Sequence, residues 1–344
     1  MDRLETLRDV NKLAVASERL FSATHEEILA GRTADVYFVK TRDVLRESGD
    51  LDAPVVAEVF SREDGIFAGS PEVFHLLRDA GVAVWSVPEG RPFGAREVLM
   101  RLEGAYGAFG LFETTILGML AASTGWATAA RRCVDAAAPK PVLCFGARHV
   151  HPAVAPVMER AALVAGGCTG ASCILGAKLA GREPQGTIPH AAILLVGETL
   201  RVAQIYDRIL PEGEPRLVLV DTFRDEAEEA LAVARVLRDR LAGIRLDTPG
   251  ERGGVTPALV REIRARLDQE AFQAVRIVVS GGLSPDRMPA LSHAGADAFG
   301  VGSYIAHATP RDMTMDIKEV RGRAVAKRGR IPGKQENPHL VQVL

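Results

Sequence analysis

The chain has 344 residues, which suggests two domains or one large domain with appendages. Its 42 Lys and Arg residues nearly balance its 44 Asp and Glu residues, and the net charge of −2 argues against a general nucleic-acid-binding protein. A hydrophobic fraction of 47% excludes a wholly disordered chain, and no apolar stretch approaches the roughly 20 residues that span a membrane. Because the N-terminus is charged where a signal peptide is apolar, we expect a soluble cytoplasmic protein with no nucleic-acid or membrane partner.

The first hundred residues contain short strand-like segments separated by glycine and proline. Three runs, at 55–60, 82–87 and 97–102, alternate partly between apolar and polar residues. The segment 313–320, near the other end of the chain, alternates too, and a single strand needs a sheet to join. We therefore predict a discontinuous α+β domain formed by residues 1–110 and completed by 306–344, in which 330–344 are loosely ordered.

Between residues 215 and 303 the sequence alternates between strand-like and helix-like patterns. Gly243 can end the first helical pattern, and Thr256-Pro257 and Ser284-Pro285 can begin the next two. The repeat of about 25 to 30 residues is typical of βα units around a parallel sheet. The apolar runs typical of buried parallel strands are 216–221, 243–247, 275–280 and 297–302.

Two further apolar runs, at 141–145 and 191–196, are predicted to be strands of the same sheet. With them, the chain has enough elements for an irregular (β/α) barrel over residues 111–305, in the α/β class. A doubly wound open sheet is the alternative.

Glycine-rich turns follow two successive predicted strands. Ser280-Gly281-Gly282 comes after the third, and Gly300-Val301-Gly302-Ser303 belongs to the fourth. Glycine lets backbone N–H groups approach phosphate oxygens, and the carboxyl ends of barrel strands carry the active site. One Gly-Gly pair fits a tight turn equally well, but two at adjacent strand ends favour a phosphate site.

Three other candidates carry side-chain chemistry. Asp221 and Asp247 end neighbouring strands; each alone can be a helix cap, and together they suit a sugar diol or a hydrated Mg²⁺. Phe145 and Arg148 follow another strand, where they can sandwich a flat ring or grip an anion. His190 stands alone, and a lone histidine is more often structural. The pattern predicts an enzyme for a phosphorylated sugar and a planar second substrate.

Four cysteines, none in a CxxC pair, indicate a reducing compartment and small buried thiols rather than a metal site. They are Cys133, Cys144, Cys168 and Cys173.

Read in order, nine short stretches resemble nicotinate phosphoribosyltransferase, a type II phosphoribosyltransferase, in the short form of archaea and some thermophilic bacteria. The resemblance implies the same fold, a barrel with a domain built from both chain ends. It implies transfer of phosphoribosyl from phosphoribosyl pyrophosphate to nicotinate, coupled to ATP hydrolysis, for salvage of NAD. The stretches are 33–37, 112–117, 145–152, 186–190, 220–222, 245–249, 279–283, 300–303 and 326–329.

The resemblance also assigns roles to residues. His190 matches the histidine that ATP phosphorylates, and Asp221 matches the carboxylate that orients it. Asp247 matches the acceptor of the ribose diol, with Arg245 beside it. Tyr37 matches an aromatic residue that closes the ring pocket of a neighbouring subunit, which implies a homodimer or a multiple of dimers.

The remaining matches concern the ring and the phosphates. Phe145 is expected to stack on the pyridine ring, with Arg148 beside it and Ser172 near it. Lys327 and Arg328 are expected to bind pyrophosphate. The 5′-phosphate cradle consists of Ser280, Gly281, Gly282, Gly300, Gly302 and Ser303.

The sequence departs from these relatives at two points. Thr169 replaces an acidic residue, and the C-terminus lacks the cysteine-rich metal knuckle of some relatives, so no zinc is expected. ATP is expected as co-substrate, and Mg²⁺ is expected to arrive with ATP or with the phosphoribosyl donor.

Three alternatives stay open. A nicotinamide enzyme of this fold places an aspartate near the ring, whereas Ser172 is neutral and Arg148 cationic, which favours an acid substrate. A quinolinate enzyme needs further cations and lacks the phosphorylated histidine, so His190 speaks against it. A non-catalytic barrel that senses nucleotides need not keep His190, Asp221 and Asp247 together.

Overall fold

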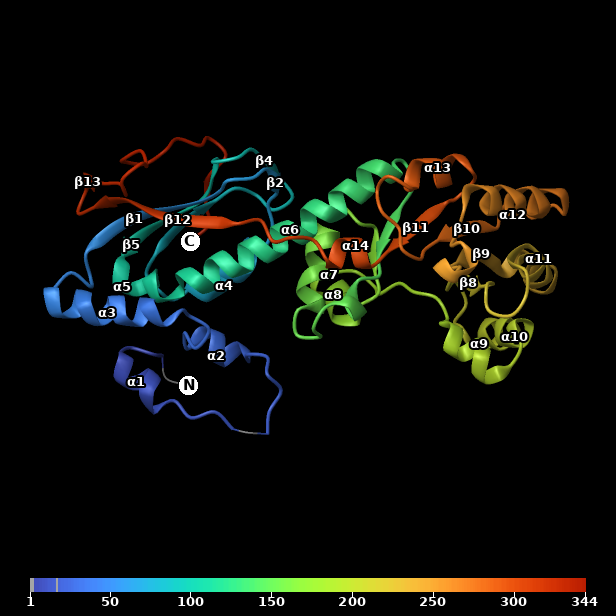
Figure 1. Cartoon of the computed structure of the whole chain (residues 1–344), viewed down its shortest axis with the longest axis horizontal. Coiled ribbons are helices and arrows are strands. Elements are labelled where there is room, and N and C mark those ends of the chain that lie inside the picture. The colour runs from blue at the N-terminus through green and yellow to red at the C-terminus, as the bar shows by residue number, and fades with distance from the viewer. Residues whose placement is uncertain (1–2, 17) are drawn as a thin grey trace. The chain divides into compact units, whose positions relative to one another are not determined.

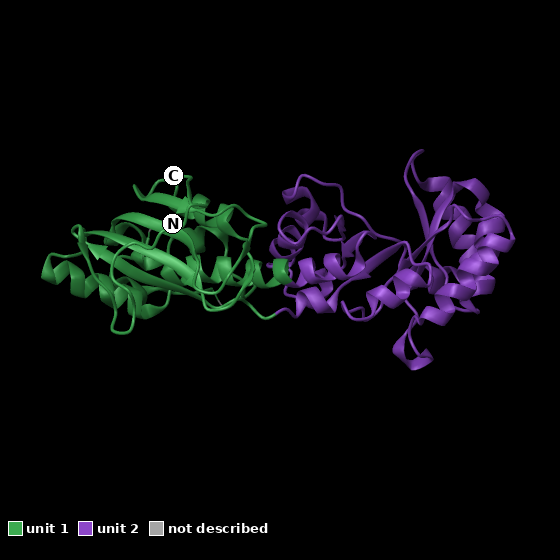
Figure 2. Cartoon of the chain, turned by 90° about the horizontal axis from the view of Figure 1, so that it is seen from above, with its two compact units in different colours: residues 1–128, 309–344 green, residues 129–308 purple. Residues whose placement is uncertain are grey.

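The computed structural model describes residues 3–16 and 18–344 (Figure 1). The chain divides into a first unit, residues 1–128 with 309–344, and a second unit, residues 129–308 (Figure 2). The boundaries expected from the sequence, 110 and 306, differ from these because helix α6 (Glu113–Ala137) runs without a break across the division.

An antiparallel sheet forms the centre of the first unit, with strand order β13-β12-β1-β5-β3-β14. The late strand β12 pairs with β1, so that Met315 lies opposite Val59. This pairing confirms that the segment near the C-terminus returns to the N-terminal sheet, and the three other predicted strands are present. The strands are β1 (Pro54–Ser61), β3 (Ala83–Ser86), β5 (Val98–Ala105), β12 (Met313–Val320), β13 (Arg323–Ala324) and β14 (Val341–Gln342), with a separate pair, β2 (Gly65–Ile66) and β4 (Pro92–Phe93).

Helices pack on this sheet and supply part of its core. Ala57 and Val59 of β1 are fully buried against Leu77 of helix α4 and Ile116 of α6. Burial of a side chain of this size contributes on the order of 1.5–3 kcal/mol. The helices of the first unit are α1 (Leu7–Lys12), α2 (His25–Leu29), α3 (Val36–Ser48), α4 (Ser70–Leu77), α5 (Tyr106–Phe109), the 3₁₀ turn η1 (Gly110–Phe112) and most of α6.

The prediction that residues 330–344 are loosely ordered is wrong. The backbone N–H of Gln335 bonds the buried carboxylate of Glu58, and the side-chain amide of Asn337 donates to the carbonyl of Val98 at 2.7 Å. Strand β14 then extends the sheet beside β3. Hydrogen bonds to Glu58 and Val98 attach the segment to the sheet, and Leu340 and Leu344 pack against the core of this unit.

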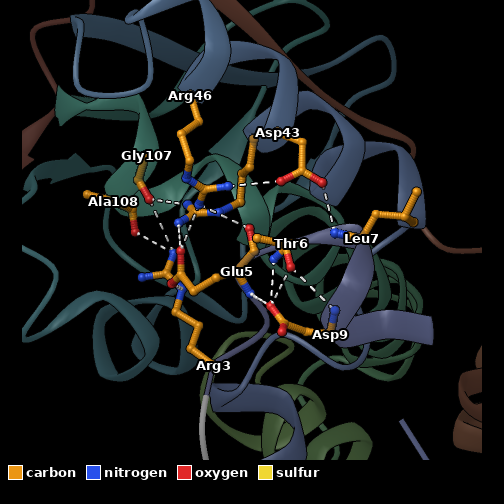
Figure 3. Close-up of polar contacts among 10 residues, drawn as sticks. Arg3, Glu5, Thr6, Leu7, Asp9, Asp43, Arg46, Gly107 and Ala108 are labelled. Carbon is orange, nitrogen blue, oxygen red and sulfur yellow. Dashed lines mark hydrogen bonds and ion pairs between the residues drawn. The ribbon is translucent and has the colours of Figure 1, made fainter. Parts of the chain in front are cut away.

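A polar network attaches the N-terminal segment to the same unit (Figure 3). The buried guanidinium of Arg42 contacts Glu5 and the carbonyl of Gly107. Asp43 accepts a hydrogen bond from the backbone N–H of Leu7 at 2.8 Å. The network therefore joins α1, α3 and α5, which lie far apart in sequence.

The second unit is built on a parallel sheet with strand order β7-β6-β11-β10-β9-β8. The α/β class is confirmed, and among the described residues the sheet is a half-barrel in which β7 and β8 are the outermost strands. Its strands are β6 (Val142–Cys144), β7 (Gly170–Ala171), β8 (Arg216–Leu219), β9 (Leu241–Leu246), β10 (Arg276–Val279) and β11 (Ala298–Val301).

Helices alternate with these strands, as the sequence predicts. They are α7 (Ala155–Val164), α8 (Ile174–Leu179), α9 (His190–Val196), α10 (Thr199–Ile209), α11 (Glu226–Leu237), α12 (Pro257–Gln269), α13 (Met288–His293) and α14 (Ser303–Ala306), with the 3₁₀ turns η2 (Ala147–His149), η3 (Arg238–Arg240) and η4 (Gly250–Arg252).

The strand predicted at 191–196 is instead helix α9. Ile193 is fully buried, whereas Leu195 is 88% exposed, so only one side of the run faces the core. Alanine and leucine are good helix formers, and Gly197 ends the helix with φ +86°. An apolar run of this length does not by itself distinguish a strand from a short helix.

Gly243 does not end a helix. Helix α11 ends at Leu237, and Gly243 lies inside β9. A Cβ there would lie 2.6 Å from the carbonyl oxygen of Arg276, so the glycine permits close approach of β10.

Among residues 3–16 and 18–344, no helix is long and apolar enough to cross a membrane.

Candidate active site at the ends of the parallel strands

The predicted site residues of the second unit follow the carboxyl ends of its strands. Asp221 follows β8, Asp247 follows β9 and Ser280 follows β10, and these strands are neighbours. Gly302 follows β11 and Phe145 follows β6, the next two strands in the order. Because parallel strands end at the same edge, these residues gather at one edge of the sheet, where ligands of such folds bind.

His190 and Asp221 are in direct contact. Nε2 of His190 lies 3.1 Å from Oδ1 of Asp221, whose side chain is fully buried while that of His190 is 38% exposed. The other oxygen of Asp221 accepts a hydrogen bond from the backbone N–H of Asp247 at 2.6 Å. Burial raises the pKa of Asp221, and the Asp247 N–H and the His190 ring oppose that rise. The carboxylate holds the imidazole by one nitrogen and leaves Nδ1 outside this contact.

Arg245 connects the next group of residues. Its guanidinium lies 3.1 Å from Oδ2 of Asp247 and donates to the hydroxyls of Ser280, at 2.8 Å, and Thr187, at 3.0 Å. The Ser280 hydroxyl lies 2.9 Å from Oδ1 of Asp247. The Asp247 carboxylate is therefore held on both oxygens. Thr187 lies in the stretch 186–190 that the sequence analysis singled out, but the sequence assigned it no role.

The glycine turns leave backbone accessible. Gly281 and Gly282 have φ of +88° and +57°, values that side chains rarely adopt, and nothing lies within 4 Å of a Cβ built on Gly282. A Cβ on Gly302 would lie 2.8 Å from the carbonyl oxygen of Phe145. Ser303 begins α14 and is half-buried. Gly282 therefore leaves open space for a ligand that approaches the backbone closely, whereas Gly302 permits close packing against the loop after β6.

Phe145 lies between two of the other predicted residues. Arg245 lies over its ring, 5.3 Å from the centroid, and a Cβ on Gly300 would lie 2.5 Å from the ring carbon Cε2. Gly300 is buried inside β11, so it makes room for this ring rather than forming part of the exposed turn. Arg148 is exposed in η2. Burial lowers the pKa of the neighbouring His149, and the Arg148 and His307 side chains act in the same direction.

Glu159 of α7 is a residue that the sequence analysis missed. Its buried carboxylate accepts hydrogen bonds from the loop after β6 and from the Ser172 hydroxyl, which lies 3.1 Å away after β7. An acidic residue in a helix usually lies on a solvated face, so the sequence held no signal for this position.

Thr169, one of the two expected departures from relatives, makes structural contacts. Its hydroxyl donates to the carbonyl of Val142 at 3.1 Å, and Arg182 donates to its carbonyl. All four cysteines are free; Cys133, Cys144 and Cys168 are buried and Cys173 is half-buried. In the described part of the chain, no group of three or more His, Cys, Asp or Glu side chains is arranged to hold a metal ion.

Three predicted residues belong to the first unit. Tyr37 lies on α3, is 54% exposed and packs against Phe38 with ring centroids 4.3 Å apart. Lys327 and Arg328 are exposed in the loop after β13. All three side chains are therefore accessible on the first unit.

Comparisons with known proteins give the same picture of the fold. The N-terminal domain model of quinolinate phosphoribosyl transferase matches residues 35–124, and the C-terminal domain model matches residues 126–316. A nicotinate phosphoribosyltransferase of Mycobacterium tuberculosis is 30% identical over 249 residues, which are 70% of this chain and 54% of that protein. The chain thus spans about half the length of this relative.

Solved structures are similar over more of the chain. A nicotinate-nucleotide pyrophosphorylase from Pyrococcus furiosus has a TM-score of 0.87 and 41% identity, over 95% of this chain and 86% of that one. Human nicotinic acid phosphoribosyltransferase shares the fold, with a TM-score of 0.66 and 19% identity over 87% of this chain and 77% of that one. Both domain models match in order and together cover most of the sequence, so the chain belongs to the quinolinate phosphoribosyl transferase family.

Proposed function

We propose that this protein transfers phosphoribosyl from phosphoribosyl pyrophosphate to a pyridine carboxylate, in the biosynthesis of NAD. Membership of the family and the arrangement of Asp247, Arg245 and the glycine turns at one sheet edge support this. Asp247 accepts the ribose hydroxyls, and the backbone N–H groups of Gly282 and Gly302 bind the 5′-phosphate.

The reaction breaks the bond from C1′ to a pyrophosphate oxygen and forms a bond from C1′ to the ring nitrogen. The developing charge on the ribose is cationic, so the reaction depends on positioning and on cations at the leaving group, and no protein nucleophile attacks C1′. Mg²⁺ accompanies the pyrophosphate as part of the substrate. Lys327 and Arg328 are the cations that we assign to the leaving group.

Nicotinate is the acceptor that we propose, with ATP as co-substrate. The observation that carries this is the contact between His190 and Asp221. An ionised Asp221 accepts the Nε2 proton, so the lone pair of His190 is on Nδ1, and the 38% exposure of the side chain leaves it accessible. Nδ1 attacks the γ-phosphate of ATP, ADP leaves, and Asp221 stabilises the cationic ring.

Quinolinate is the second candidate acceptor. The description of the family models and the 41% identity to the Pyrococcus furiosus structure favour it. A second ring carboxylate needs further cations; Arg245 lies over the Phe145 ring, and Arg148 follows Phe145 by three residues in the turn η2.

One experiment separates the candidates. The purified protein is supplied with phosphoribosyl pyrophosphate and Mg²⁺, and pyrophosphate release is measured with nicotinate, quinolinate or nicotinamide, each with and without ATP. We expect nicotinate to give the largest kcat/KM and to stimulate ATP hydrolysis. Use of quinolinate alone, with no effect of ATP, would assign the second candidate, and release with none of the three would refute the transferase proposal.

We further propose that the protein acts in the cytoplasm as a homodimer or a multiple of dimers in which Tyr37 completes the ring pocket of a neighbouring subunit. Its exposure on α3 is compatible with that role. Two inactive variants, Tyr37→Ala and Asp247→Ala, should regain part of the activity when mixed, because a hybrid dimer has one intact site. A fully active monomer would contradict this arrangement.

A further inference from the structure

Glu159 is a buried carboxylate that contacts two loops at the site edge of the second unit. It lies on α7 and its exposed fraction is 0%. Its Oε1 accepts hydrogen bonds from the backbone N–H groups of Gly146 and Ala147, each at 3.1 Å. The same oxygen lies 3.1 Å from the Ser172 hydroxyl, and Oε2 accepts the backbone N–H of Cys173.

The contacts of Glu159 fit an ionised carboxylate. The three backbone partners can only donate, and Oε1 already accepts two N–H groups, so the Ser172 hydroxyl is the fourth donor. Hydrogen bonds to an ionised group are about twice as strong as those between neutral groups. The Glu159 carboxylate therefore accepts hydrogen bonds from four donor groups in the loops that follow strands β6 and β7.

These two loops carry the residues assigned to the acceptor ring. Phe145 and Arg148 flank Gly146 and Ala147, and Ser172 precedes Cys173. The residues assigned to the ribose have contacts of their own, with Arg245 and Ser280 on Asp247. The hydroxyl proton of Ser172 is committed to Glu159, so this oxygen offers lone pairs to a ligand and does not donate to a ring carboxylate.

We infer that Glu159 is a positioning residue for the acceptor ring: it holds the loops after β6 and β7 in place and orients Ser172. The inference rests on the proposed function in assigning the ring to these loops. If the Ser172 hydroxyl donates to Glu159, the ring carboxylate of the acceptor binds to cations such as Arg148 and not to Ser172.

The test is a comparison of variants in the full-length protein. Glu159→Gln keeps the size of the side chain but turns an NH₂ group toward one of the donors. We expect the KM for the pyridine acceptor to rise by about tenfold or more, and the KM for phosphoribosyl pyrophosphate to change by less than about twofold. Ser172→Ala removes one of the four bonds and should raise the acceptor KM by less than about threefold.

Asp207→Asn is the matched control. Asp207 is another buried carboxylate of the second unit, and it pairs with Arg216 at the opposite, N-terminal end of β8. Asp207→Asn should lower the melting temperature, but it should not raise the KM for the pyridine acceptor more than the KM for phosphoribosyl pyrophosphate. If Glu159→Gln behaves as this control does, or raises both KM values equally, Glu159 is only structural and the inference is overturned.

Hydrogen exchange gives a readout that does not need turnover. In Glu159→Gln the amides of Gly146, Ala147 and Cys173 should exchange faster, while those of Gly281 and Gly282 should not change. Unchanged exchange at the first three amides would overturn the inference even if the enzyme is active. A wild-type protein that uses no pyridine acceptor would refute the proposed function, and the exchange data would still decide whether Glu159 holds the loops.

Discussion

Two polar networks, one in each unit, differ in where they end. In the first unit, the guanidinium groups of Arg3 and Arg42 donate to backbone carbonyls, and Arg42 also donates to Glu5. These hydrogen bonds attach the segment that leads into α1 to the rest of the unit (Figure 3). In the second unit, buried Asp221 holds His190 by one nitrogen and leaves the other outside the contact, on a side chain that is 38% exposed. The first arrangement contributes stability, and the second orients the His190 ring while leaving part of it accessible.

The largest expected effect concerns the His190 ring. His190→Ala should abolish ATP hydrolysis, a loss of more than about 100-fold, because no other group replaces the nucleophile. Slow transfer without ATP should remain, since His190 makes no bond to C1′. The measurement is an acid-labile, base-stable phosphate label from radioactive ATP.

The matched control is His293→Ala, since the His293 ring already contacts a backbone carbonyl at 2.7 Å. It should label as wild type does. If His190→Ala is labelled too, or if the wild type is not, His190 is a structural histidine.

A second prediction compares two glycines of the site. Gly300→Ala places a methyl group 2.5 Å from the Phe145 ring, so the ring must move and the acceptor KM should rise by about tenfold. In Gly282→Ala the added methyl group meets no atom within 4 Å. The only cost is the backbone strain of a φ of +57°, about 1 kcal/mol of stability. Steady-state kinetics with both substrates checks this, and an equal effect of both variants on the acceptor KM would contradict it.

The network of the first unit should respond in stability. Arg42→Met leaves the Gly107 carbonyl with only the 3.4 Å contact from Arg3, and it leaves Glu5 without its buried partner. We expect a loss of about 2–3 kcal/mol in the free energy of unfolding. Arg46→Ala should lower the free energy of unfolding by less than about 0.5 kcal/mol, because the Arg46 side chain, which pairs with Asp43, is 41% exposed. Urea unfolding of both variants measures the difference, and similar losses would mean that burial of Arg42 does not matter.

The smallest expected effect is a pH dependence. Burial, with the nearby Asp316 carboxylate, raises the pKa of Glu113 from 4.5 to about 7. Between these values the folded state holds a proton that the unfolded state has lost, so the free energy of unfolding falls as the pH rises from 4.5 to 7. Because the side chain is only partly buried, we expect a fall of about 1–2 kcal/mol.

Glu113→Gln should remove this fall and should make the protein more stable than wild type at pH 8. Parallel unfolding curves for the two proteins across the pH range would show that Glu113 titrates normally.

Much of the fold could be predicted from the sequence because the patterns are local. The alternation at 55–60 and 313–320 identified two strands, and the need of a lone strand for a partner joined the two chain ends. The prediction of a strand at 191–196 is wrong, because an apolar run of that length also suits a helix with one buried side, and here Ile193 and Val196 face the core. The prediction for residues 330–344 is wrong because the segment is attached through hydrogen bonds to Glu58 and Val98, which are distant in sequence and leave no trace in a hydrophobic pattern.

The sequence by itself determined which residue types follow each strand: carboxylates after β8 and β9, and glycines after β10 and β11. These follow from local chemistry, because a turn after a parallel strand needs glycine or a polar cap. Only the tertiary structure decided that Asp221 binds His190, that Arg245 links Asp247 to Ser280, and that Glu159 connects two loops. The contacts of Glu159 with Ser172, His190 with Asp221 and Arg245 with Ser280 join residues 13, 31 and 35 positions apart. Their geometry depends on how strands and helices pack rather than on any local pattern.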